Sequence, residues 1–314
     1  VIVGVIVILF AFFSLMSASF RKYTTIITMC SYMYYIMLMA IGVTFPLITG
    51  GVDLSIGTGL VCYSIVGSYI MRQMGLPIGI AMAVTIGMGI AFGFVNGIIV
   101  AKLNLPPFIT TLCTMMIARG LGSILTNGMT GVWPMAGQPG SWCRDILKYK
   151  IGDTIYPIGM IIILVLVVIM SIVLNHTRVG RYIIAIGSNK EALKLSGVSV
   201  VRWHVMAYVI SGFFAGLAAI AYACTFTSIT PGTGAGLELD AIGGAIIGGT
   251  AMTGGSGSIV GTFLGVCLIS LLKTGLPNIG LQANWQQIIT GGMLIDAVKK
   301  KKKKRKKGHT IQTV

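Results

Sequence analysis

Charged residues are scarce in this chain of 314 residues. Asp, Glu, Lys and Arg make up 10% of it, against 55% hydrophobic residues, and the mean hydropathy is +0.91. A soluble domain carries about 25% charged residues, so this chain has too few charges to coat a water-exposed surface. They suffice for the two polar ends of a helical bundle whose middle faces lipid. The composition therefore predicts an integral membrane protein.

Acidic residues are scarcer still, with 7 against 23 Lys and Arg. Nine of the 23 basic residues form one run at 299–307, and the remainder of the chain is only modestly basic. Nucleic-acid binding requires a basic, aromatic-laced soluble face, and we expect no nucleic-acid partner. We divide the chain into a transmembrane domain, 1–298, and a polybasic cytoplasmic tail, 299–314. The tail is either a solvated charge run or a segment attracted to anionic lipid.

Recognisable catalytic and metal-binding patterns are missing. The six cysteines are scattered without metal or redox spacing, and the three histidines lie far apart in the sequence. We therefore predict no catalytic residue, no metal site and no cofactor in this chain. No Walker-type phosphate-binding loop is present, so an ATP-driven activity would need a partner subunit to hold ATP and magnesium.

The sequence consists mostly of apolar segments of about 20 residues. Each is long enough to span a bilayer as a helix. They predict an all-α fold, a polytopic membrane helical bundle with about ten transmembrane helices. The expected segments are roughly 1–20, 29–48, 53–72, 77–100, 108–127, 155–175, 204–226, 237–251, 257–274 and 284–298. The eighth and tenth are short.

Lys and Arg are concentrated in the loop 176–203 and in the tail. Because basic loops stay on the cytoplasmic side, we place both there, together with both chain termini, in the inner membrane of a bacterium. Counting the membrane segments from these cytoplasmic loops places Arg21, Lys22, Arg72 and the loop 128–154 outside the cell membrane.

Glycine spacing predicts how the helices pack. Small residues recur every four positions at 89, 93 and 97, at 257, 261 and 265, and at 212 and 216. This spacing puts them on one helix face, where two backbones can approach closely. A further similarity, between 53–57 and 240–243, suggests two halves of five helices related as an inverted repeat.

Three acids lie at the edges of apolar segments beside glycine-rich sequence: Asp53, Glu238 and Asp240. Each either caps a helix N-terminus or lines a polar path through the membrane. Carboxylates and amides suit the hydroxyl groups of sugars, so we add Ser55 and Asn96 to the predicted translocation path.

The loop 179–198 is too polar to enter lipid and contains a helix-forming stretch, Lys190 to Leu195, followed by Ser196 and Gly197. It is either a short amphipathic helix that docks in a partner's groove or an ordinary helical loop.

At this loop the sequence resembles a known family. Five blocks in order are similar to the permeases of ribose-type monosaccharide ABC importers: 50–57 (GGVDLSIG), 96–120, 191–197 (EALKLSG), 238–257 and 285–289 (WQQII). The third block is similar to the Glu-Ala-Ala-x-x-x-Gly coupling element of ABC permeases, with Leu193 in place of the second Ala.

The resemblance implies three protein partners: a second permease copy or a paralogue, a cytoplasmic ABC ATPase and an extracytoplasmic sugar-binding protein. It also implies that a helix at 187–197 enters the ATPase. The residues expected to couple the two subunits are Gly187, Asn189, Glu191, Ala192, Leu195, Ser196 and Gly197. An ion-coupled secondary transporter, an ABC permease for a nucleoside or amino acid, and a membrane-embedded enzyme are the alternatives.

Overall fold

The computed structural model describes residues 2–135, 137–282, 285, 287–292 and 295. Its first half contains α1 (Ile2–Met16), α2 (Tyr23–Ile48), α3 (Ser55–Arg72), α4 (Ile78–Ala101), α5 (Pro107–Leu125) and α6 (Trp142–Asp145). A hairpin of β1 (Tyr149–Ile151) and β2 (Thr154–Tyr156) follows. The second half contains α7 (Gly159–His176), α8 (Arg178–Ser188), α9 (Lys190–Leu195), α10 (Val200–Thr225), α11 (Leu237–Ile247) and α12 (Ile259–Asn278).

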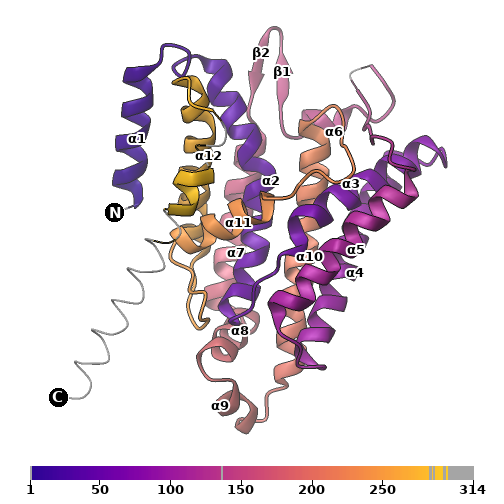
Figure 1. The fold of residues 1–314 in the computed structure, drawn as a ribbon, viewed down its shortest axis with the longest axis vertical. Coiled ribbons are helices and arrows are strands. Elements are labelled where there is room, and N and C mark those ends of the chain that lie inside the picture. Colours follow the sequence, from indigo (N-terminus) through magenta and orange to yellow (C-terminus); the bar gives the residue numbers. More distant parts are fainter. Residues whose placement is uncertain (1, 136, 283–284, 286, 293–294, 296–314) are drawn as a thin grey trace.

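The two longest helices, α2 and α10, pack against each other at the centre of the bundle (Figure 1). Helices α3, α4 and α5 lie on one side of this pair, and α11, α12 and α1 lie on the other. From Met33 onward every residue of α2 is buried, whereas fewer than a third of the residues in the apolar spans of α4, α5 and α7 are buried. Helices that are apolar all round are typical of a bundle surrounded by lipid.

Six described helices are long and apolar enough to cross a membrane: α2, α4, α5, α7, α10 and α12. The predicted all-α bundle fits this structure. Nine of the ten predicted segments coincide with helices, but α1 and α11 are short, with 15 and 11 residues. The tenth segment, 284–298, lies largely outside the described residues, and the tail 299–314 lies wholly outside them.

The boundary predicted for the sixth segment is wrong. We expected a helix from 155, but β2 occupies this position and α7 begins at Gly159. The hairpin pairs Tyr149 with Tyr156, and Gly152 takes a φ of 58° in the two-residue turn. Glycine tolerates this left-handed conformation, which two-residue hairpin turns require.

The predicted glycine contacts are confirmed. A side chain at Gly93 would overlap the carbonyl oxygen of Tyr208, and one at Gly212 would overlap that of Gly89. Backbones of α4 and α10 therefore touch directly. The same relationship joins α11 to α12, where Gly265 lies against the carbonyl oxygen of Gly244.

Candidate functional site

A non-helical break separates α2 from α3, and Asp53 lies in it with 1% of its surface exposed. Three hydrogen bonds converge on its carboxylate. The amide of Ser55 donates at 3.1 Å, its hydroxyl at 2.6 Å, and the hydroxyl of Ser211 at 2.7 Å. Asp53 thus holds the first turn of α3 and, at the same time, ties the break to α10.

The same polar cluster reaches α4 and α5. Asn96 is fully buried and donates through its side-chain nitrogen to the Ser55 hydroxyl at 3.0 Å. The hydroxyl of Thr111 donates to the carbonyl oxygen of Val52 at 3.1 Å. The structure therefore brings together three residues of the predicted path, Asp53, Ser55 and Asn96, and joins them to four helices.

Helix α10 contributes a polar face that sequence analysis missed. His204, Tyr208 and Ser211 recur at spacings of four and three residues, so they share one face, and all three are buried. The rings of His204 and Tyr208 lie 5.9 Å apart. Neither ring nitrogen of His204 nor the Tyr208 hydroxyl has a hydrogen-bond partner within the described chain. Helical spacing of polar residues in an apolar segment was the available signal.

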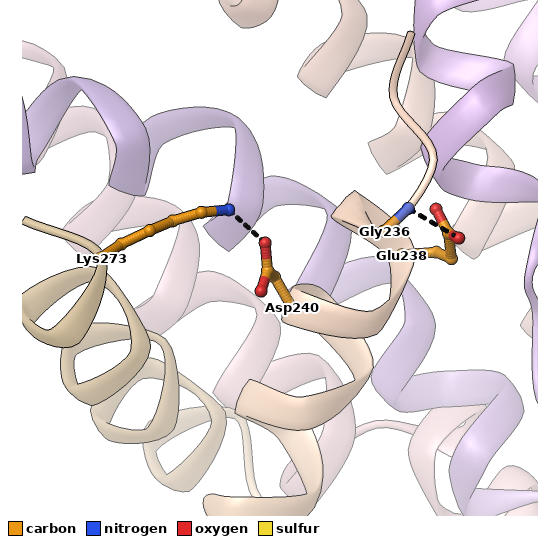
Figure 2. A network of polar contacts seen from close by, with 4 residues as sticks. All are labelled: Gly236, Glu238, Asp240 and Lys273. Carbon is orange, nitrogen blue, oxygen red and sulfur yellow. Dashed lines mark hydrogen bonds and ion pairs between the residues drawn. The ribbon is translucent and has the colours of Figure 1, made fainter. Parts of the chain in front are cut away.

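The other two predicted acids occupy the first turn of α11 (Figure 2). Glu238 accepts a hydrogen bond of 3.0 Å from the amide of Gly236. Its second carboxylate oxygen lies where a side chain on Gly57 of α3 would stand, so only glycine permits this contact. Asp240 points to the opposite side and forms an ion pair with Lys273 of α12.

Two cations within apolar helices also escaped the sequence analysis. Lys273 is one, and a single Lys in the apolar run 257–274 was the signal for it. Arg119 is the other: it is exposed on α5, a 19-residue candidate membrane span. A charged residue at this depth avoids lipid tails and faces water or protein.

The loop 176–203 folds into two helices, α8 and α9, at one end of the bundle (Figure 1). The predicted helical stretch Lys190 to Leu195 is confirmed as α9. The wider helix implied over 187–197 is wrong at its start, because residue 187 belongs to α8 and Asn189 breaks the chain direction with φ −157° and ψ 95°. Asn189 also caps α9 by accepting a 2.9 Å hydrogen bond from the amide of Ala192. The other predicted coupling residues on and after α9 are all exposed: Glu191, Ala192, Leu195, Ser196 and Gly197.

One leucine of α9 faces the core and the other faces outward. Leu193 packs in a small apolar cluster with Ile186 and Val200, which holds α9 against α8 and α10. Leu195 is 88% exposed. An isolated exposed leucine is ordinary on a protein surface, but here it forms the tip of a capped helix that projects from the membrane domain.

Gly187 is half-buried and lies at a junction of three backbones. A side chain there would overlap the carbonyl oxygen of Ile48 and the amide nitrogen of Gly255. That amide donates to the Ile48 carbonyl at 2.8 Å. The end of α8 thus touches the end of α2, five residues before Asp53.

Comparison with known proteins identifies the family. The family model described as "Branched-chain amino acid transport system / permease component" matches residues 25–298. The chain belongs to this permease family. The match runs from the start of α2 past α12 and therefore includes the Asp53 cluster, α8, α9 and the Asp240–Lys273 pair.

Several curated relatives of the permease are sugar import permeases. A fructose import permease, FruG of Bifidobacterium longum, is 36% identical over 83% of this chain and 77% of its own length. The ribose import permease RbsC of Escherichia coli is 34% identical over 93% of this chain and 90% of its own length. The galactose/methyl galactoside import permease MglC of Salmonella typhimurium is 33% identical over 83% of this chain and 81% of its own length. No solved structure matches the permease. The resemblance to ribose-type monosaccharide permeases is confirmed.

Proposed function

We propose that this chain is the membrane-spanning permease subunit of an ATP-binding cassette importer that takes up a monosaccharide. The similarity to fructose, ribose and galactose import permeases supports this function, because it extends over 83 to 93% of the chain. ATP and magnesium bind the partner ATPase. A soluble extracytoplasmic protein delivers the sugar. An ion-coupled carrier or a membrane-embedded enzyme has no support in these relatives.

The proposed topology has ten crossings in the bacterial inner membrane, with both termini in the cytoplasm. It consists of α1 to α5, α7, α10, α11, α12 and the segment 284–298. Helix α11 is too short to cross alone at 1.5 Å per residue, so the glycine-rich segment after it completes the crossing. An inverted repeat is supported by α3 and α11, which both follow a non-helical stretch and carry an acid at their start: Asp53 and Asp240.

The sugar path in this proposal runs between two permease copies. The exposed face of α5 around Arg119 is its wall, because this face carries a charge that acyl chains cannot solvate. Behind it lie four of the residues predicted from sequence, Asp53, Ser55, Asn96 and Glu238, whereas Asp240 pairs with Lys273 on the other side of the bundle. In the described structure these four are buried and hydrogen-bonded, so they support the wall from inside.

The observation that carries the ATP-driven mechanism is the exposed side of α9. Its cap at Asn189 and its buried Leu193 fix the helix without help from a partner, and Leu195 is left free at the tip. An amphipathic helix inserted in a groove is a common mode of protein recognition. We place this helix in a groove of the cytoplasmic ATPase, with Leu195 as its apolar anchor and Glu191 beside it.

Copurification with the cognate ATPase tests this proposal. Leu195→Ser and Glu191→Lys should each reduce ATPase recovery and stimulated ATP hydrolysis by about tenfold, since loss of a buried anchor costs about 1–2 kcal/mol. Leu103→Ser is the matched control, because Leu103 is 61% exposed and follows α4 outside α9. If all three variants retain the ATPase equally, α9 is not the docking element. If the native chain retains no ATPase, the importer assignment fails.

A further inference from the structure

A cavity of about 580 Å³ lies between the α3–α4 turn and the segment that leads into α6. This region is at the end of the bundle opposite α8 and α9 (Figure 1). The residues that surround the cavity are Met71, Arg72, Gly75, Leu76, Pro77, Ile78, Val132, Pro134, Gln138, Pro139, Gly140 and Trp142.

The lining has one charge and otherwise little polarity. Arg72 is its only ionisable residue, and the guanidinium makes no ion pair or hydrogen bond within the described chain. Aliphatic side chains and three prolines form most of the wall. A free sugar needs several hydrogen-bonding groups around it, which this wall does not offer. A molecule with an anionic group and an apolar body complements both features.

The position of the cavity matches the surface of a bilayer. Helix α3 ends at Arg72, and the candidate membrane span α4 begins at Ile78. Trp142 is half-exposed, and Met74 and Leu76 in the α3–α4 turn are exposed as well. Tryptophan and arginine at the ends of membrane helices are typical of the interface between acyl chains and headgroups.

We propose that this cavity binds an anionic phospholipid. Arg72 pairs with the lipid phosphate, which arginine can bind through two parallel hydrogen bonds. Trp142 covers the glycerol region, and Ile78 with Val132 contacts the start of an acyl chain. The bound lipid would join the α3–α4 turn to the outer segment that carries α6. This site is separate from the sugar path and does not depend on the proposed transport function.

Native mass spectrometry of the detergent-purified chain with added phosphatidylglycerol or phosphatidylcholine tests the proposal. The native protein should retain one phosphatidylglycerol in preference to phosphatidylcholine. Arg72→Gln should weaken that retention by about tenfold, the effect of losing one charge-assisted contact. Arg21→Gln is the matched control, because Arg21 is exposed at the same end but does not line the cavity.

Trp142→Ala provides the second variant. It removes apolar cover without changing charge, so it should weaken retention of phosphatidylglycerol while the thermal unfolding midpoint stays near that of the native protein. Equal retention of both lipids by the native protein would overturn the proposal. So would unchanged phosphatidylglycerol retention in Arg72→Gln, or displacement of the lipid by millimolar ribose or fructose, which would make the cavity a sugar site.

Discussion

The Ser211 hydroxyl donates a 2.7 Å hydrogen bond to the carboxylate of Asp53, and both side chains are buried. The two residues are 158 positions apart, so this bond joins the break between α2 and α3 to the middle of α10. The buried carboxylate has no cationic partner within the described chain. Hydroxyl donors are therefore its principal stabilisation.

Ser211→Ala should lower the free energy of unfolding by about 2 kcal/mol, because it removes a hydrogen bond to a buried charged group. Ser270→Ala is the matched control. Ser270 is also a fully buried helical serine, but its hydroxyl has no partner in the described structure, so its loss should be neutral or slightly stabilising. Thermal unfolding in detergent, followed by tryptophan fluorescence, measures both. Equal destabilisation by the two variants would show that the Asp53 bond contributes nothing specific.

Lys273→Met should destabilise the protein by about 3 kcal/mol, because it leaves the partly buried carboxylate of Asp240 without its partner. The double variant Lys273→Met with Asp240→Asn should recover most of this loss, since neither charge then remains. A double-mutant cycle in thermal unfolding measures the coupling between the two sites. Additive effects of the two single substitutions would contradict the ion pair in Figure 2.

Gly187→Ala should uncouple ATP hydrolysis from uptake. The added methyl group would overlap backbone atoms of Ile48 and Gly255, so the end of α8 must move away from the break that holds Asp53. We expect uptake to fall by at least about tenfold while ATP hydrolysis continues. Gly79→Ala in α4 is the control, because its added methyl group would meet nothing within 4 Å. Normal uptake in Gly187→Ala would remove this junction from the mechanism.

The native Cys113 reports on the exposed face of α5. It is the exposed member of the six free cysteines, and it lies on the helix that carries Arg119. If this face lines a water-filled path, Cys113 should react with a charged methanethiosulfonate reagent during ATP-driven turnover. Cys113→Ser should abolish the labelling. Ile161→Cys, added to Cys113→Ser, should stay unlabelled because Ile161 is exposed on the apolar helix α7. Similar labelling at both positions would contradict a distinct path along α5.

The length of the apolar segments was enough to predict most helices, because a membrane helix satisfies its own backbone groups wherever the segment is long and apolar. It located α2, α4 and α10 to within a few residues at one end or both. It failed where tertiary contacts decide the structure. Helix α11 stops after 11 residues, and the β1–β2 hairpin replaces the expected start of the sixth segment.

The candidate site was predicted only in part for a related reason. Asp53 and Asn96 stood out because polar residues are rare in apolar segments, but their meeting through Ser55 depends on how α3 packs against α4. Ser211 did not stand out by rarity, since serine is common in membrane helices, and only its helical spacing from His204 and Tyr208 marked it. Lys273 could have been found by asking which cation neutralises Asp240, a question that a search limited to acids does not raise.

ATP-dependent sugar uptake into proteoliposomes is the most direct test of the assigned function. The chain would be reconstituted with its cognate ATPase and binding protein, and labelled ribose, fructose and galactose would be supplied with and without ATP inside. We predict accumulation of at least one of these monosaccharides that requires ATP, the binding protein and an intact Leu195. Uptake that follows a sodium or proton gradient and ignores ATP would contradict the assignment and identify an ion-coupled carrier.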